Sequence, residues 1–183
     1  MTISPLLATR RRGCVPLLAA ALLGSCAATA DTPIAEQAFR MTLPGPWTSR
    51  HDPSGTLWVF GSSAHPEQLT VQILYASEPM EPDEQAKTLD ELLDRRRKAQ
   101  IMRAQSPVLI SETIRSTQGD ALVARYEGIE PVGPRWSATM VLVTREAAAV
   151  FYFEHVGNKD DRTAARVRAA FGSVVLQAAR GLR

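Results

Sequence analysis

The sequence predicts an α+β fold in which helices pack on both faces of an antiparallel β-sheet. Three consecutive stretches, Leu122–Gly128, Trp136–Thr144 and Ala148–His155, have the composition of neighbouring strands. The second half of the middle stretch is apolar at successive positions. Because strand side chains alternate between faces, this pattern is typical of a sheet that is covered on both sides. The short connection Thr144–Ala147 predicts an antiparallel hairpin between the last two strands.

The length and composition indicate one globular domain. The chain has 183 residues, of which 45% are hydrophobic and 22% are charged. Its formal charge is +2, but Arg10, Arg11 and Arg12 lie in a segment that we expect to be removed. Removing these three of the 21 basic residues leaves 18 against 19 acidic ones. The net charge therefore gives no reason to expect a nucleic-acid partner.

The N-terminus has the pattern of a secretory signal peptide, which we assign to residues 1–25. Arg10–Arg12 form a positive region, Val15–Leu23 is an apolar run broken by Pro16, and small residues follow. The run is much shorter than the roughly 20 apolar residues that a membrane-spanning helix needs. We therefore expect an exported protein.

The segment Leu23-Gly24-Ser25-Cys26 resembles the lipobox of bacterial lipoproteins, whose cysteine receives diacylglycerol and becomes the new N-terminus. The two cysteines are Cys14 and Cys26, so the folded region has no disulfide although its compartment permits one. Lipidation explains why Cys26 is retained. The resemblance predicts a lipid anchor on the periplasmic side of a bacterial membrane. Cleavage after Ala28-Thr29-Ala30 would instead give a soluble periplasmic protein.

The mature chain is predicted to begin with a short tether, residues 26–35, followed by a single α+β domain over residues 36–179. The tether is predicted from small and polar residues around one proline. Besides the three central stretches, four strands are predicted: Ala38–Leu43, Thr56–Gly61, Gln68–Ala76 and Val108–Ser116. Apolar residues alternate in Ala38–Leu43 and in Gln68–Ala76.

One long helix is predicted over Thr88–Arg103. Thr88 and Glu91 form a T-x-x-E capping box, in which each side chain satisfies a free backbone donor of the other residue. Arg96 lies beside the apolar stripe of this helix, so it must either find a partner or extend its charge to water.

A second helix is predicted to start after the polar loop Gly157–Asp161, in which Asn158, Asp160 and Asp161 are candidate caps. Its buried stripe consists of apolar residues three to four positions apart, namely Ala164, Val167, Phe171 and Val174. The two helices would supply the layers that cover the sheet.

No pattern in the sequence selects a catalytic residue, a metal site or a cofactor. The histidines, His51, His65 and His155, lie in two loops and at a strand end, and none has the spacing of metal ligands. Glu154 beside His155 is a candidate acid–base pair, but strand alternation points the two side chains to opposite faces. We therefore expect neither catalysis nor a bound cofactor.

The densest basic run, Arg95-Arg96-Arg97-Lys98, has two interpretations. A solvated helix face neutralised by its own acids, such as Asp94 four residues before Lys98, is the simpler one. The other is a partner-binding surface formed by Arg95, Arg97 and Lys98, with Glu130 and Arg135 from the connection between two predicted strands.

An F-x-M-x-L-P strand, Phe39–Pro44, opens the domain, and Trp47 follows it closely. The helix Thr88–Arg103, the strand meander and the closing helix within Phe151–Phe171 come next. This order resembles the Mog1/PsbP-like fold, an α/β/α sandwich, and bacterial exported lipoproteins of the DcrB type. The resemblance covers about Phe39–Leu176. It implies a binding or accessory protein, and it offers no catalytic residues to transfer.

These observations predict a non-enzymatic periplasmic lipoprotein that binds a protein partner or supports the cell envelope. The partner would be an envelope protein or a secreted toxin, against which the chain would act as an immunity protein. Two alternatives stay open, a periplasmic hydrolase of unrecognised type and a carrier of a small ligand. A hydrolase needs polar residues that converge in a cleft, and a carrier needs a deep apolar pocket. A protein-binding module needs an exposed binding surface.

If Cys26 is lipidated, replacing it should change where the protein is found. We expect Cys26→Ala to block maturation or to release the protein into the soluble periplasm, because the thiol is the acceptor of the diacylglycerol. Cell fractionation and labelling with radioactive palmitate measure the two effects, and Cys14→Ala is the matched control. A wild-type protein that never takes up the label would show that the lipobox prediction is wrong.

Overall fold

The computed structural model describes residues 30–36, 38–51, 56–104 and 106–177. The predicted signal peptide and Cys26 lie outside the described residues. In chain order the elements are β1 (Thr32–Ala35), β2 (Phe39–Leu43), β3 (Trp47–His51), β4 (Leu57–Ser62), β5 (Glu67–Tyr75), α1 (Pro82–Arg103), β6 (Leu109–Ile110), β7 (Ile114–Gln118), β8 (Ala121–Glu130), β9 (Arg135–Val143), β10 (Ala147–Val156), α2 (Asp161–Gly172) and β11 (Val175–Leu176).

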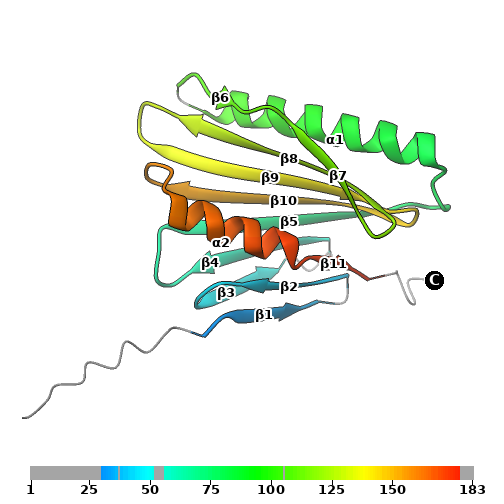
Figure 1. The fold of residues 1–183 in the computed structure, drawn as a ribbon, viewed down its shortest axis with the longest axis horizontal. Helices are drawn as coiled ribbons and strands as arrows, with labels where there is room; N and C mark the ends of the chain where they lie inside the picture. Colours follow the sequence, from blue (N-terminus) through cyan, green and yellow to red (C-terminus); the bar gives the residue numbers. More distant parts are fainter. Residues whose placement is uncertain (1–29, 37, 52–55, 105, 178–183) are drawn as a thin grey trace, which may run out of the picture.

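The strands form two antiparallel sheets. The larger sheet has the order β3-β4-β5-β10-β9-β8-β6, with β7 also paired to β8, and the smaller sheet has the order β1-β2-β11. Figure 1 shows the large sheet as a twisted band, with α1 along its upper part, α2 across its middle and the small sheet below.

The two helices pack on opposite faces of the large sheet. On β9, Met140 and Leu142 belong to the hydrophobic cluster that contains α2, whereas Val141 and Val143 belong to the cluster that contains α1. Because side chains alternate along a strand, this division places the helices on opposite faces. Phe39 of the small sheet belongs to the α2 cluster. The predicted α+β fold with an antiparallel sheet is therefore confirmed.

The predicted central meander is also confirmed, and β10 is its most buried strand. Seven successive residues, Ala147–Phe153, are buried, so both faces of the strand are covered. Phe151 is 0% exposed, and its ring lies edge-on to that of Phe39 at 5.8 Å between centroids. The ring of Phe171 on α2 lies 6.4 Å from Phe151 on the same face.

Helix α1 begins at Pro82 rather than at the predicted Thr88. The Glu84 carboxylate accepts a hydrogen bond of 3.1 Å from the backbone N–H of Glu81, which is half of a capping box about two turns upstream of the predicted one. Proline is favourable in the first turn because its missing N–H would have no helical partner there. Thr88 lies inside the helix, and its hydroxyl contacts the Met80 sulfur at 3.6 Å.

The single strand predicted over Val108–Ser116 is wrong, because this segment forms two strands, β6 and β7. Ile110 pairs with Gly128, and Ile114 pairs with Arg125. Three residues of this segment therefore oppose two of β8, and the extra residue interrupts the ladder as in a β-bulge.

The second half of the predicted tether is not a free linker. Thr32–Ala35 form β1 and pair with β2. The Thr32 hydroxyl donates to the carbonyl of Gly45 at 2.6 Å, which fixes the start of the strand against the turn after β2. Its small and polar composition did not exclude a strand, because pairing with β2 supplies partners for its backbone groups.

The start of α2 agrees with the prediction, since one of the candidate caps is used. The Asp160 carboxylate accepts a hydrogen bond of 2.8 Å from the backbone N–H of Thr163. This bond lowers the pKa of the Asp160 carboxyl. The helix ends at Gly172, so Val174 is buried from the segment that follows the helix.

Phe151 gives a direct test of the core. We expect Phe151→Ala to lower the free energy of unfolding by about 3–5 kcal/mol, because a buried ring is replaced by a cavity. Denaturant melts measure the change, and Val175→Ala at an exposed position is the control, expected within about 0.5 kcal/mol of wild type. A loss below about 0.5 kcal/mol for Phe151→Ala would contradict the assigned core.

Candidate functional site

Two depressions flank helix α2 on the face of the large sheet that it covers. Both are lined by Val167 and Phe171 of the helix. The smaller one lies towards the turn between β2 and β3, and the larger one lies towards β6, β7, β8 and β9. Helix α2 therefore divides this face into two candidate sites of different character.

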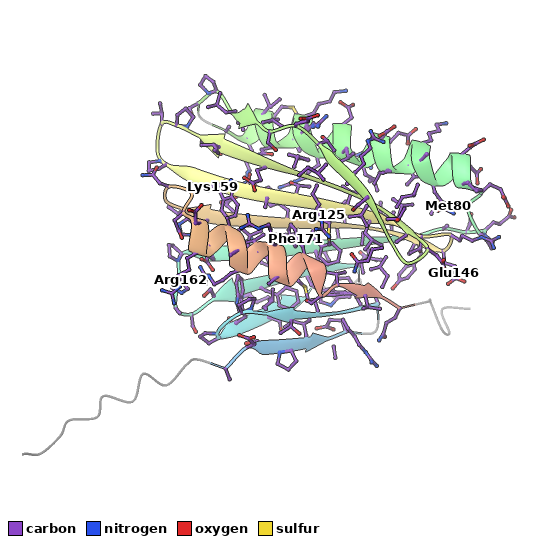
Figure 2. All side chains as sticks on the ribbon, viewed as in Figure 1. Met80, Arg125, Glu146, Lys159, Arg162 and Phe171 are labelled. Atoms are coloured by element: carbon purple, nitrogen blue, oxygen red, sulfur yellow. The ribbon has the colours of Figure 1, made fainter. Side chains whose placement is uncertain are left out.

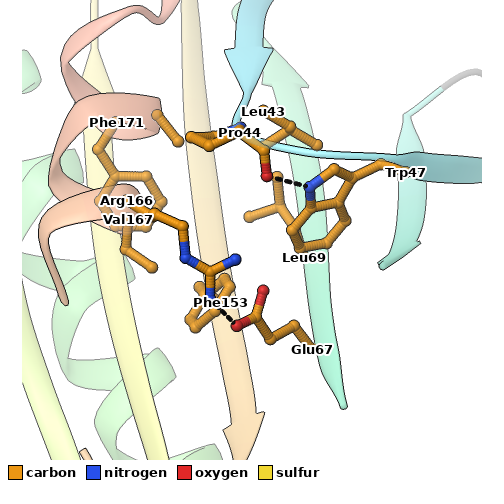
Figure 3. Close-up of a pocket in the computed structure, with 10 residues that line it drawn as sticks. Leu43, Pro44, Trp47, Glu67, Leu69, Phe153, Arg166, Val167 and Phe171 are labelled. Carbon is orange, nitrogen blue, oxygen red and sulfur yellow. Dashed lines mark hydrogen bonds and ion pairs between the residues drawn. The ribbon is translucent and has the colours of Figure 1, made fainter. Parts of the chain in front are cut away.

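The smaller depression is a narrow apolar pocket (Figure 3). Leu43, Pro44, Leu69 and Phe153 contribute to its walls, and Trp47 donates a hydrogen bond of 3.1 Å from its indole nitrogen to the carbonyl of Pro44. Its volume of about 10 Å³ accommodates about one water molecule. Ligand pockets typically hold about 300–1,000 Å³, so this pocket does not favour the small-ligand carrier.

A buried ion cluster closes one end of this pocket. The Glu67 side chain is only 1% exposed, and Arg166 donates a hydrogen bond to its carboxylate. Arg166 also donates to the Thr163 hydroxyl at 3.1 Å, and the Nδ1 atom of His155 lies 3.5 Å from the Glu67 carboxylate. The arginine neutralises a charge that would otherwise be costly to bury. The cluster thereby joins α2 to β5 and β10.

The larger depression is a groove of about 420 Å³ between α2 and the β6–β7 segment. We call it the α2–β7 groove, and its lining residues from β8 and β9 are Arg125, Tyr126, Glu127, Trp136, Ala138 and Thr139. Ala164, Val167, Arg168 and Phe171 form one wall, and Ser111, Glu112 and Ile114 form the other. The groove combines apolar walls with a few charged groups, which is the usual character of a binding site.

Arg125 is the unusual residue of the α2–β7 groove. It is opposite Ile114 on one side and Met140 on the other in the strand register, so it belongs to the face that α2 covers. Figure 2 shows Arg125 on the strip of sheet beside α2. Its Nε atom is buried without a hydrogen-bond partner, and no ion pair is formed by its guanidinium among residues 30–177 where these are described. Burial lowers the pKa of this guanidinium, because removal from water disfavours the charged form.

Glu127, two residues further along β8, is satisfied within the protein. Its carboxylate accepts hydrogen bonds from Lys159 at 2.5 Å and from the indole nitrogen of Trp136 at 3.2 Å. Lys159 also lies 5.9 Å from the centroid of the Trp136 ring. Glu127 is thus neutralised locally and does not compensate the charge of Arg125.

A second polar layer lies on the opposite face, beneath the C-terminal half of α1. The guanidinium of Arg96 stacks on the ring of Tyr152 at 3.5 Å, and that of Arg97 lies 5.2 Å from the ring of Tyr126. Burial is the main cause that raises the pKa of Tyr152 to about 12. These contacts confirm that Arg96 finds a partner, and they turn Arg97 towards the sheet rather than into solvent.

The Gln100 side chain of α1 occupies the space beside a glycine of β8 in this layer. The Gln100 amide donates to the Ser137 hydroxyl at 2.7 Å, and a Cβ at Gly128 would lie only 2.0 Å from the Gln100 nitrogen. Both Gln100 and Ser137 are buried. A side chain at Gly128 would therefore displace the Gln100 amide and disturb its hydrogen bond to Ser137.

The five predicted partner-binding residues lie on the α1 side but do not form one free surface. Arg95 is exposed, and Lys98 pairs with Asp94 at 2.6 Å as predicted. Arg135 pairs with Glu154 at 3.1 Å, and the Glu130 charge acts on the nearby Arg103. Arg97 donates a hydrogen bond to the Thr113 hydroxyl. Partner binding by these residues stays a prediction.

The described histidine side chains, those of His65 and His155, have different surroundings. His155 faces Glu67 on the α2 side, whereas Glu154 binds Arg103 and Arg135 on the α1 side, so the predicted separation of Glu154 from His155 is confirmed. His65 is exposed in the connection between β4 and β5, and the side chain of His51 lies outside the described residues.

Two global features bear on metal and membrane association. No group of three or more His, Cys, Asp and Glu side chains is arranged to hold a metal ion in the part of the chain that the structure describes. Neither α1 nor α2 has the length and apolar character of a membrane-crossing helix.

Sequence reasoning missed Arg125, Glu67 and Arg166. Arg125 carried a usable signal, because it is the one basic residue within the apolar stretch Ala121–Tyr126 and shares a face with Val123. Glu67 and Arg166 are separated by 99 positions in the chain, and nothing in the local pattern connects them.

Comparison with solved structures identifies the fold. The solution structure of the cyanobacterial PsbP protein CyanoP from Synechocystis superposes with a TM-score of 0.63 and 15% identity over 85% of this chain and 99% of that one. The Ran-binding protein Mog1p of Saccharomyces cerevisiae gives a TM-score of 0.54 and 9% identity over 81% and 96%. A Bacteroides thetaiotaomicron protein gives 0.54 and 10% identity over 83% of this chain and 50% of its own.

At such low sequence identity, these similarities show a shared fold and nothing about function. The Mog1/PsbP-like fold predicted from the sequence is confirmed, and likeness to the DcrB type stays a prediction. No protein-family model and no curated protein matches the sequence.

The buried ion pair can be tested through stability. We expect Arg166→Met to lower the free energy of unfolding by about 3 kcal/mol, because it leaves the Glu67 carboxylate buried without its cation. Adding Glu67→Gln to that variant should recover part of the loss, since the uncompensated charge is then removed.

Denaturant melts measure all the variants, and Arg162→Met at an exposed position of the same helix is the control, expected within about 0.5 kcal/mol of wild type. Equal stabilities of Arg166→Met and Arg162→Met would contradict the role assigned to the ion pair.

Proposed function

We propose that this protein is a non-enzymatic accessory protein of the bacterial cell envelope that binds a partner protein through the α2–β7 groove. The observation that supports the proposal most strongly is Arg125, a partly buried cation that has no partner among the described residues and lies in a largely apolar groove. A charge in such a position costs stability unless something compensates it, and a bound partner would do so.

The fold is compatible with this role. Mog1p, which has the same fold, is a Ran-binding protein, so the architecture supports protein recognition in at least that case. The likeness does not identify the partner, because function depends on the site rather than on the fold.

The location is proposed from the N-terminal sequence. Export by the signal peptide and lipidation of Cys26 would hold the domain at the periplasmic side of the membrane. Both an envelope component and a secreted toxin would meet the protein there, so the proposal includes action as an immunity protein.

Site-specific photo-crosslinking in cells tests this proposal. A photoreactive amino acid is introduced into the full chain at Ser111 and at Arg168, which lie on the two walls of the groove. We expect both positions to give the same discrete adduct with one envelope-fraction protein. Glu91 and Arg95, exposed on α1, are the matched control positions and should not give it.

The pattern of adducts decides between outcomes. An adduct from Arg95 but not from the groove would support the surface first predicted on α1 and reject the groove. Absence of a discrete adduct from all four positions would contradict a protein-binding role.

A further inference from the structure

We infer, resting on the proposed function, that the α2–β7 groove recognises an acidic segment of its protein partner, in which a carboxylate flanked by apolar side chains pairs with Arg125. The inference combines three observations: the unpaired guanidinium, the balance of the other charges in the groove, and the apolar residues that surround Arg125.

The first observation concerns the guanidinium itself. Arg125 lies between Ile114 and Met140 in the strand register, so its neighbours across the sheet are both apolar. A guanidinium presents several N–H donors in a planar fork, and a carboxylate matches that fork with two parallel hydrogen bonds. A carboxylate at this point would satisfy the buried donor and compensate the charge together.

The second observation concerns the other charged residues of the groove. Glu127 is neutralised by Lys159 and Trp136, as described above. Arg168 and Glu112 are exposed on opposite walls, so they remain solvated. Arg125 is therefore the charged group in the groove that would gain most from a new ion pair when a bound partner excludes water.

The third observation distinguishes an acidic protein segment from an anionic membrane surface. Recognition of anionic lipid usually involves a cluster of about 4–8 basic residues. The groove instead offers Arg125 with one further arginine, Arg168, at its rim. Ile114 is 70% exposed beside it, and Phe171 and Ala138 also line the groove. A single charge among apolar contacts suits one acidic side chain within an apolar segment.

Strand β7 provides one exposed wall of the groove and also a control residue outside it. Ile114, Arg115, Ser116 and Thr117 are all exposed, and β7 pairs on one side with β8. Ile114 and Arg115 point to opposite faces of the sheet, and Arg115 pairs with Asp90 of α1 at 2.5 Å. Arg115 is thus a neighbouring arginine outside the groove, which makes it a matched control for Arg125.

Selection from a random library of displayed 12-residue peptides tests the inference with the full chain immobilised. We expect the wild-type protein and Arg115→Gln to enrich peptides that contain Asp or Glu between apolar residues. Arg125→Gln should lose this preference, and Arg125→Glu should enrich Lys or Arg at the same place, because the sign of the recognised charge is reversed.

The affinity of the best wild-type peptide is then compared with that of its counterpart in which the acidic residue is replaced by its amide. Relative to the acidic peptide with the wild-type protein, we expect the affinity to fall by about tenfold or more in two cases. These are the amide peptide with the wild-type protein and the acidic peptide with Arg125→Gln. Circular dichroism verifies that each variant is folded, and Arg125→Lys, which retains the charge, provides a second variant with intermediate affinity.

Several results would overturn the inference. These are enrichment without acidic residues, equal binding of the acidic and amide peptides, or Arg125→Gln binding as wild type does. Binding to phosphatidylglycerol vesicles that depends on Arg125, in the absence of any selected peptide, would show that the groove recognises a lipid surface instead. If photo-crosslinking still finds a partner when these tests fail, the binding function stands and only the acidic recognition is rejected.

Discussion

Strand β10 is buried on both faces over Ala147–Phe153, and the rest of the architecture follows from this constraint. A strand without a solvated face needs an apolar layer on each side, and one helix cannot provide both. Helix α1 covers one face through Leu89, Leu92 and Leu93. The other face is covered by α2 together with the small sheet, whose Phe39 contacts Trp58, Phe60 and Phe151 edge-on. The burial of this central strand thus requires a covering layer on each face of the large sheet.

The two covering layers differ in how they accommodate charge. Beneath α1, arginines stack on tyrosines, and the polar groups share one continuous layer that includes Gln100 and Ser137. On the α2 side, Glu67 is neutralised by a single arginine at the edge of an apolar core. In both arrangements the arginines have a carboxylate or an aromatic ring as a partner, although the Nε atoms of Arg96, Arg97 and Arg166 have no hydrogen-bond partner. Arg125 has neither a carboxylate nor a ring as a partner within the described residues, which is why the α2–β7 groove stands out as the candidate binding site.

The groove exists because α2 does not extend across the whole sheet. The helix packs through Ala164, Val167, Ala170 and Phe171, and the β8 edge beyond them is left to Arg125 and Glu127. The irregular β6–β7 segment supplies the second wall, so the interruption of that predicted strand is also what shapes the site. A partner bound here would complete a layer that the chain itself leaves open.

The sequence alone determined those features that depend on local periodicity. The apolar runs of β8, β9 and β10 and the polar capping residues before α2 can be recognised from residues a few positions apart, so the α+β class and the order of elements were predictable. The start of α1 was not, because Thr88–Glu91 and Glu81–Glu84 both satisfy a capping pattern and the choice depends on how the helix packs. The tertiary structure alone decided that Glu67 meets Arg166, that Arg97 turns inward and that Arg125 has no partner within the described part of the chain. Pairing between charges depends on which distant segments the fold brings together, and a strand pattern specifies a face but not the neighbour on it.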